Sequence, residues 1–153
     1  MAAAPPASAE CLLLTAHPDG RVLGQIGVRP ANPTFTITIV HSVTRTPVVE
    51  RYRVDGASIV QTAIVFSQHG PGLPTEADAD GAWSREGDRF VVTMARRFGT
   101  IAMRVHAAQS PRLAVAGDPL PVDLAQWGNR AIALGARAGA CPAGPQDGAR
   151  GAR

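Results

Sequence analysis

Polar and apolar residues alternate along the stretch from Thr34 to Val43. Side chains of a β-strand point alternately to its two faces, so this pattern predicts a strand with one buried face. The buried phase holds Phe35, Ile37, Ile39, His41 and Val43. An imidazole among four apolar side chains is unusual, and it makes His41 the first residue to consider for function.

Two turns are predicted to fold this strand against the next two. A four-residue turn over Thr44–Pro47 places His41 opposite Glu50 on the second strand. An Asp-Gly pair then favours a two-residue hairpin, which places Glu50 opposite Gln61 on the third strand. This register keeps apolar residues opposite apolar residues. The sequence therefore predicts a polar row of His41, Glu50 and Gln61 between two apolar rows.

Alternating stretches separated by turn residues continue along most of the chain. The predicted hairpins join residues 11–16 to 21–28, 90–94 to 101–105, 113–115 to 120–122, and 122–124 to 132–134. About ten short strands without a credible helix are typical of one fold class. We therefore expect an all-β protein, an antiparallel β-sandwich or flattened barrel that is rich in hairpins.

The length of 153 residues suits a single domain with its own hydrophobic core. The predicted strands place this β domain at residues 11–135. Residues 1–10 are small and Pro-containing, and we expect them to be unstructured. Residues 136–153 are mostly Ala, Gly, Pro and Arg, with nothing large to bury, so this tail is predicted to be disordered.

The charge pattern argues against nucleic-acid binding. The formal net charge is +3, all fifteen basic residues are arginines, and Arg96-Arg97 is the only adjacent basic pair. Nucleic-acid binding needs a concentrated basic face, usually with aromatic residues for stacking. No apolar run approaches the ~20 residues of a transmembrane helix. We expect neither a nucleic-acid partner nor a transmembrane segment.

Two motifs carry a resemblance to a known family. The segment HSVTRTPVVE at 41–50, followed by GPGLP at 70–74, resembles the bacterial family called domain of unknown function 1850. The likeness begins at the Cys11-Leu12 strand and extends loosely to about Leu134. The resemblance implies a small exported domain, encoded beside or fused to tripartite TRAP transporters of the TAXI type. It implies no particular reaction, because we know of no established activity for the family.

Localisation follows from this resemblance and from the first residues of the chain. Ala7-Ser8-Ala9 fits the small-x-small pattern before a signal-peptidase cut, although any Ala-rich segment produces such a pattern by chance. Family members usually begin with a hydrophobic export segment, and this chain does not. We expect a periplasmic or exported protein, and a cytoplasmic one if the present start is the native start.

The two cysteines, Cys11 and Cys141, allow two interpretations. In an oxidising compartment they could form a disulfide that holds the tail against the first strand. Because Cys141 lies in the segment predicted to be disordered, we expect two unpaired thiols instead. Their spacing does not match a zinc motif.

Enzymatic chemistry finds little support among the motifs. Ser42 follows His41, but neighbours on a strand point to opposite faces and cannot form a catalytic dyad. His41, Glu50 and His69 could converge on a metal ion, although no short-range ligand spacing supports this. The acidic run over 76–81 resembles a calcium loop but lacks its closing acidic ligand, so we expect a solvated loop. We predict no metal and no cofactor.

The polar row His41–Glu50–Gln61 is either a structural network or the floor of a pocket. In the second interpretation Arg45 and Thr46 form the mouth. The roof is a loop that presents backbone N–H groups to an anion or serves only as a rigid turn. The residues of this loop are Gly70, Gly72, Leu73 and Pro74.

Arginine at the mouth would suit a ligand that carries a carboxylate. We expect a non-catalytic accessory module of a TAXI-type TRAP transporter. It would bind the membrane or substrate-binding subunits of the transporter, or a small organic acid. The alternative is a small hydrolase or metal-dependent enzyme that uses His41 and Glu50.

Overall fold

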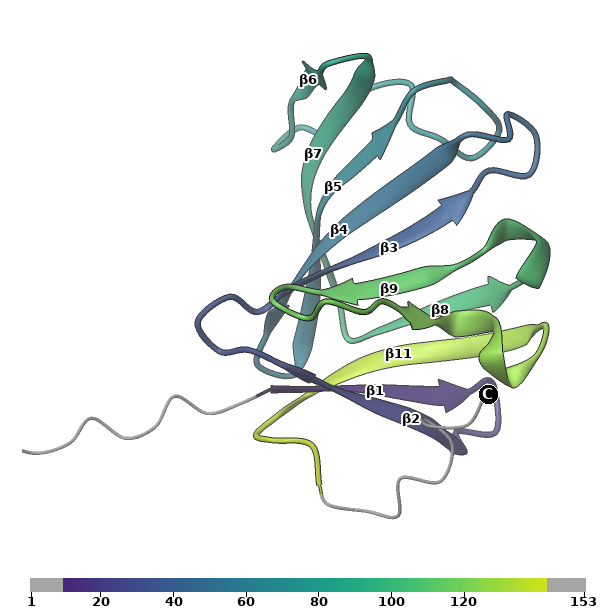
Figure 1. Ribbon diagram of the computed structural model, residues 1–153. Coiled ribbons are helices and arrows are strands. Elements are labelled where there is room, and N and C mark those ends of the chain that lie inside the picture. Colours follow the sequence, from purple (N-terminus) through teal and green to yellow (C-terminus); the bar gives the residue numbers. More distant parts are fainter. Residues whose placement is uncertain (1–9, 143–153) are drawn as a thin grey trace, which may run out of the picture.

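The computed structural model describes residues 10–142, which fold into eleven β-strands and two short 3-10 helices (Figure 1). This confirms the all-β prediction. The strands are β1 (Glu10–Ala16), β2 (Val22–Val28), β3 (Thr34–Val40), β4 (Pro47–Asp55), β5 (Ser58–Phe66), β6 (Trp83–Glu86), β7 (Arg89–Phe98), β8 (Thr100–Val105), β9 (Arg112–Val115), β10 (Val122–Asp123) and β11 (Arg130–Ala138). The 3-10 helices are η1 (Ala107–Gln109) and η2 (Leu124–Trp127).

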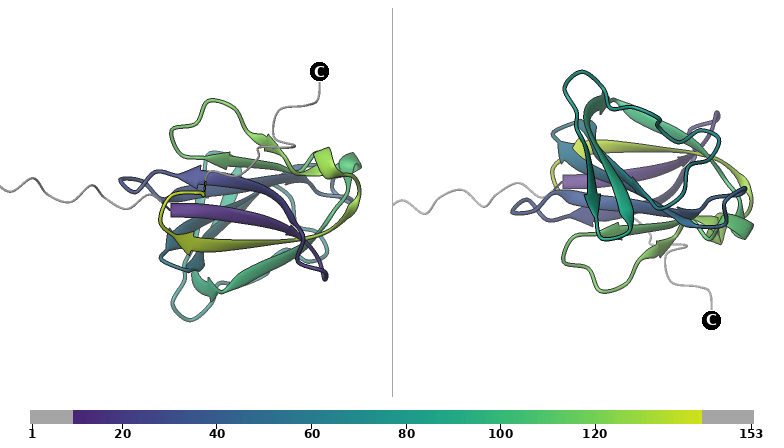
Figure 2. Two further views of the ribbon diagram at one scale, coloured as in Figure 1. Left: turned by 90° about the horizontal axis from the view of Figure 1, so that it is seen from below. Right: turned by 90° about the horizontal axis from the view of Figure 1, so that it is seen from above.

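The strands form two antiparallel sheets. The smaller sheet has the order β2-β1-β11-β8, and the larger has the order β10-β9-β3-β4-β5-β7-β6. Figure 1 shows the smaller sheet at the bottom and the larger sheet fanning out above it, and Figure 2 shows β1, β2 and β11 in front when the molecule is seen from below. No helix in the described residues is long and apolar enough to span a membrane.

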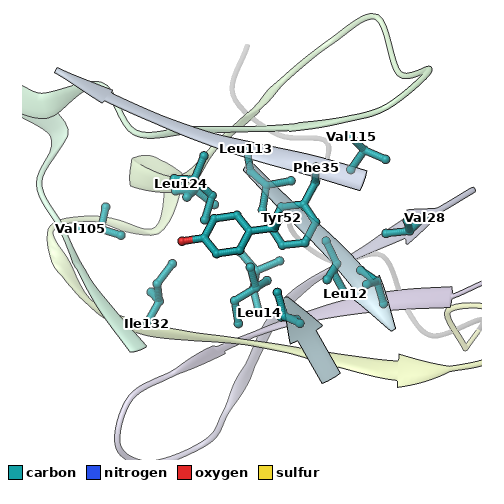
Figure 3. Packing of buried hydrophobic residues seen from close by; sticks show 14 residues of the cluster. Leu12, Leu14, Val28, Phe35, Tyr52, Val105, Leu113, Val115, Leu124 and Ile132 are labelled. Carbon is teal, nitrogen blue, oxygen red and sulfur yellow. The ribbon is translucent and has the colours of Figure 1, made fainter. Parts of the chain in front are cut away.

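The main core lies between the two sheets (Figure 3). The rings of Phe35 and Tyr52 stack at its centre, with their centroids 5.0 Å apart. Phe35 and Ile37 are buried, as the alternation along β3 predicts. The buried members are Leu12, Leu14, Val28, Phe35, Ile37, Tyr52, Val54, Ile59, Val105, Leu113, Val115, Leu124, Ile132 and Leu134.

A second apolar cluster covers another part of the larger sheet. Its buried members, from β4, β5 and β7, are Val48, Ile64, Phe66, Val92 and Met94. Leu73 and Ala77 of the long connection between β5 and β6 pack against this cluster. This connection thus shields apolar residues of the larger sheet that are not part of the main core.

The turn between β3 and β4 is longer than the sequence predicts. Its six residues, 41–46, are closed by hydrogen bonds from His41 N–H to Thr46 O and from Arg45 N–H to His41 O, both 2.9 Å. Ile39 therefore pairs with Val48, whereas the predicted register pairs it with Tyr52. The shift is an even number of residues, so the side chains of β3 and β4 keep their predicted faces but change partners. Val43, predicted to be buried, lies in the turn and is 64% exposed.

The next hairpin also differs from the prediction. Asp55 pairs with Ser58, which makes Gly56 and Ala57 the two turn residues, and Gly56 has a positive φ of 60°. An irregularity in the ladder around Thr62 shifts the register again. As a result Gln61 pairs with Tyr52, and Glu50 pairs with Ile64.

Two predicted hairpins are wrong. β7 pairs with β5 and β6, and the chain then crosses at Gly99 to the smaller sheet, where β8 pairs with β11. β11 pairs with β1 and β8, and not with β10. Of the third predicted pair, Leu113–Val122 is confirmed, whereas Leu120 lies outside the strand and is 77% exposed.

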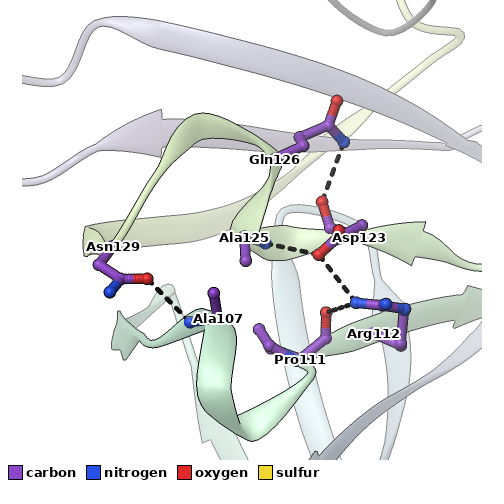
Figure 4. Close-up of polar contacts among 7 residues, drawn as sticks. All are labelled: Ala107, Pro111, Arg112, Asp123, Ala125, Gln126 and Asn129. Atoms are coloured by element: carbon purple, nitrogen blue, oxygen red, sulfur yellow. Dashed lines mark hydrogen bonds and ion pairs between the residues drawn. The ribbon is translucent and has the colours of Figure 1, made fainter. Parts of the chain in front are cut away.

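Local hydrogen bonds explain why β10 does not continue into a hairpin (Figure 4). The carboxylate of Asp123 accepts from Ala125 N–H at 2.9 Å, which caps η2, and from Arg112 at 2.8 Å. The side chain of Asn129 accepts from Ala107 N–H at 2.8 Å and ties the start of β11 to η1. These bonds turn the chain toward the smaller sheet instead of back along β10.

The two ends of the described chain are joined by a disulfide between Cys11 and Cys141, so the expectation of two unpaired thiols is wrong. The predicted bounds of the two unstructured ends also differ from the structure, since Glu10 is already part of β1. β11 continues to Ala138, and residues 136–138 pair with residues 10–12 of β1. The remaining predictions for the two ends, on residues 1–9 and 143–153, lie outside the described residues.

Candidate functional site

His41 lies where β3 ends and the 41–46 turn begins, and only 8% of its surface is exposed. Its Nδ1 accepts hydrogen bonds from the N–H groups of Val43 (3.1 Å) and Thr44 (3.2 Å). An Nδ1 atom that accepts carries no proton, so the proton that the ring can donate is on Nε2. That proton is donated to the carbonyl oxygen of Pro71 at 2.9 Å. Both ring nitrogens are thus engaged by the backbone.

The imidazole holds two loops together, and we call this contact the His41 clasp. A Cβ atom at Gly70 would lie 3.0 Å from His41 Cε1 and 2.8 Å from Thr44 Cγ2, so the close approach requires glycine. Leu73 N–H donates to Gly70 O at 3.1 Å, so it is not free for the anion site, which was one of the two interpretations of this loop. Gly72 has a φ of +81°, as a tight turn requires, and Pro74 follows in the same loop. The geometry of the 70–74 loop is that of a rigid turn.

Arg45 and Thr46 belong to the same turn as the clasp. Arg45 is exposed and has a positive φ of 60°, which is uncommon for a residue with a side chain. The hydroxyl groups of Thr46 and Thr44 lie 2.7 Å apart. The predicted mouth residues therefore stand beside His41, but as parts of a hydrogen-bonded turn.

Glu50 is not opposite His41. It pairs with Ile37 and Ile64, and its Oε2 accepts a hydrogen bond from the hydroxyl of Tyr52 at 2.6 Å. Burial raises the pKa of Tyr52, and the Glu50 carboxylate raises it further through its charge and this hydrogen bond. Tyr52 thus remains a neutral donor to Glu50. The predicted row of His41, Glu50 and Gln61 does not form, because the longer turn moves His41 beyond the ladder.

A different polar row crosses the larger sheet. Gln61, only 7% exposed, pairs with Tyr52 on one side and with Arg96 on the other. Arg96 binds the carboxylate of Asp78 through two hydrogen bonds of 2.7 Å. The hydrogen bond and charge of Arg96 lower the pKa of Asp78. Arg96 thereby attaches the long β5–β6 connection to the sheet, and we call Glu50, Gln61, Arg96 and Asp78 the polar belt.

The polar belt falls between the residues of the two apolar clusters. Along β4, Glu50 separates Val48 of the second cluster from Tyr52 of the main core. Along β5, Gln61 similarly separates Ile64 from Ile59. The charged members of the belt are already bonded to Tyr52 or to each other. This arrangement suits a structural junction between two cores better than a catalytic centre.

A cluster of aromatic side chains near β6 is a feature that sequence reasoning missed. The rings of His69 and Trp83 stack almost parallel at 5.9 Å, and Phe66 and Phe90 lie within 6 Å of both. We call these four residues the aromatic cluster. His69 is exposed and 37% of Trp83 is exposed. The sequence offers only a weak indication of this cluster, because its members are separated in the chain and Trp83 by itself suggests only a lid or corner residue.

His69 therefore stacks on aromatic rings, whereas His41 bonds to Pro71 and Glu50 bonds to Tyr52. The convergence of these three residues that was considered from the sequence is not seen among the described contacts. Within residues 10–142, no group of three His, Cys, Asp or Glu side chains could hold a metal ion. Ser42 is exposed in the turn, and Nδ1 of His41 is occupied by backbone N–H groups.

Comparison with known proteins places the chain in a family without a described activity. No curated protein and no solved structure matches the chain. A family model described as Domain of unknown function (DUF1850) matches residues 35–122, which is more than half of the 153 residues. The matched region includes the His41 clasp, the polar belt and the aromatic cluster. The chain therefore belongs to this DUF1850 family.

Proposed function

We propose that this chain is a non-catalytic, exported accessory module of a TAXI-type TRAP transporter, and that it binds a protein subunit of that transporter. The observation that carries the proposal is the His41 clasp. Both nitrogens of the motif histidine bond to the backbone, so the imidazole acts as a structural element that presents two loops as one rigid surface. A general base would need a free nitrogen in reach of its substrate.

The disulfide supports the proposed location. Disulfides persist in oxidising compartments such as the periplasm and are rare in the cytosol. The Cys11–Cys141 bond joins the first strand to the chain just beyond the last strand, and so it belongs to the folded domain. A periplasmic or exported module would keep this bond.

Partner binding is better supported than the two alternatives. The mouth expected for a small organic acid is a hydrogen-bonded turn on which Arg45 is exposed, and the Leu73 N–H of the 70–74 loop already donates to Gly70 O. An enzyme built on His41 and Glu50 would need these side chains to be in contact, and they bond instead to Pro71 and Tyr52. The exposed aromatic residues beside β6 suit a protein interface, where tryptophan is enriched.

The experiment is affinity purification of the tagged chain from the native cell envelope, followed by mass spectrometry. We expect a substrate-binding or membrane subunit of a TAXI-type TRAP transporter to be enriched over a tagged, unrelated envelope protein. Thiol labelling of the purified chain should find both cysteines oxidised. Recovery of the chain from the cytosol with free thiols, or purification without any transporter subunit, would refute the proposal.

A further inference from the structure

The larger sheet ends in a short strand with one unpaired side. β6 is the last strand in the order of this sheet, and all four of its residues are exposed. Its only described partner is β7, through the pairs Trp83–Val92, Ser84–Val91, Arg85–Phe90 and Glu86–Arg89. An unpaired strand edge is a template for pairing with another extended chain.

The direction of the free backbone groups follows from the neighbouring hydrogen bonds. Thr93 N–H donates to Ala82 O at 2.9 Å, so the backbone of residue 82 faces β7. Backbone groups alternate in direction along a strand, and Ser84 and Glu86 therefore also face β7. The N–H and C=O groups of Trp83 and Arg85 point away from the sheet. The edge thus offers two donors and two acceptors to an added strand.

The side chains beside this edge carry a specific chemistry. Arg85 lies over the ring of Phe90, with its guanidinium carbon 5.0 Å from the ring centroid, which orients the cation. Neither Arg85 nor Arg89 takes part in a salt bridge among the described residues, whereas Glu86 is bound by Arg51 at 3.0 Å. The edge therefore combines an exposed tryptophan with the guanidinium of Arg85, which makes no salt bridge among the described residues.

Charge disfavours a second copy of this chain as the occupant. A two-fold pairing centred on Arg85 would oppose two like charges across the new ladder. A pairing centred on Ser84 would bring the hairpin tip, with Asp88, toward Asp80 of the other copy. Like charges directly opposite each other destabilise a strand pair.

We propose that the β6 edge binds an extended segment of another protein, in which an acidic residue and an apolar residue alternate on one face. The acidic side chain pairs with Arg85, and the apolar side chain packs against Trp83 and the aromatic cluster. Main-chain hydrogen bonds to residues 83 and 85 supply the remaining affinity. This proposal rests on the proposed function, since it names the surface that would receive a transporter subunit.

The first test uses three fluorescently labelled peptides with the repeat X-Thr-Val-Thr, where X is Glu, Gln or Lys. Fluorescence anisotropy measures their binding to the full chain. We expect the Glu peptide to bind about 2- to 5-fold more tightly than the Gln peptide, because Arg85 is exposed and an ion pair at an exposed site contributes a factor of this size. The Lys peptide should bind most weakly.

Two matched variants locate the effect. Arg85→Glu should reverse the order and favour the Lys peptide, whereas Arg21→Glu makes the same charge change at an exposed position in the β1–β2 turn and should leave the order unchanged. Circular dichroism would confirm that both variants fold. Equal binding of the three peptides, or the same effect from both variants, would overturn the proposal. So would a dimer in sedimentation velocity that Trp83→Ala abolishes.

The same variants separate this proposal from the proposed function. If Arg85→Glu loses the transporter subunit in the envelope purification and Arg21→Glu keeps it, both proposals are supported. If both variants keep the subunit, the β6 edge is not its binding site and this proposal fails alone. If the peptides show the expected order but no transporter subunit is recovered with any variant, the proposal for the β6 edge is supported and the proposed function fails.

Discussion

Loss of the Cys11–Cys141 disulfide should reduce the stability of the domain strongly. The bond joins residues 130 positions apart, so it closes most of the described chain into one loop. The chain-entropy model gives about 5 kcal/mol for a loop of this length, and removal of native disulfides costs about 2–5 kcal/mol. Breaking the bond should change the folded state little, because seven residue pairs between β1 and β11 still hold β11 in place. We expect a loss of about 2–5 kcal/mol.

Urea unfolding, followed by tryptophan fluorescence with and without a reducing agent, measures this loss. Cys141→Ser should unfold like the reduced wild type, and a reducing agent should not change it further. Reduction should also open residues 139–142 to proteases before the strands are cleaved, since they lie beyond β11 and lose their covalent attachment.

A change under about 1 kcal/mol on reduction would refute the reasoning, provided that thiol labelling confirms that the bond is broken. That result would mean that the unfolded chain gains little freedom when the loop is opened. A larger loss in Cys141→Ser than in the reduced wild type would point to a separate effect of the serine itself.

Three further predictions concern the clasp and the belt. Tyr52→Phe removes the donor to Glu50 and should cost about 1.5–3 kcal/mol. Because the folded pKa of Tyr52 is raised, its contribution to wild-type stability should be complete below the ordinary value of about 10 and decline as pH rises above it, and the variant should lack this decline. Gly70→Ala should lower the free energy of unfolding by about 1–3 kcal/mol, because its Cβ would clash with His41 and Thr44. At Gly99 an added Cβ would have no atom within 4 Å, so Gly99→Ala should cost under about 0.5 kcal/mol. His41→Phe keeps a ring but loses its hydrogen bonds, so it should cost about 1–3 kcal/mol and speed hydrogen exchange in residues 41–46 and 70–73.

Each of these predictions has a clear contrary result. Identical pH profiles for the wild type and Tyr52→Phe would show that another group titrates there. Equal stabilities of Gly70→Ala and Gly99→Ala would show that the two loops are not held in close contact. If His41→Phe exchanges like the wild type in both loops, the imidazole does not join them.

The His41 clasp shows which features of this site could be predicted from the local sequence and which could not. Alternation along β3 placed His41 in the buried phase, and it is buried. The hydrogen-bond partner of the imidazole, Pro71, could not be predicted, because the predicted turn was two residues shorter than the observed one. That turn depends on the histidine itself, which accepts hydrogen bonds from two backbone N–H groups and keeps those residues out of the ladder. The length of a turn that depends on hydrogen bonds from one side chain cannot be predicted from the alternation of polar and apolar residues.

The sequence alone determined the all-β class, most of the strands and the buried face of β3, because a period of two is a property of each strand by itself. It also predicted that β1 pairs with β2, β3 with β4, β4 with β5 and β9 with β10, but it did not determine the pairs between strands that are not neighbours in the chain. The same alternation fits a hairpin of β7 with β8 or a crossing between sheets at Gly99, and burial between the two sheets selects the crossing. The polar belt, the aromatic cluster and the Cys11–Cys141 bond likewise join residues far apart in the chain. Only the tertiary structure decided them, because their partners are brought together by the packing of the whole domain and not by neighbours in sequence.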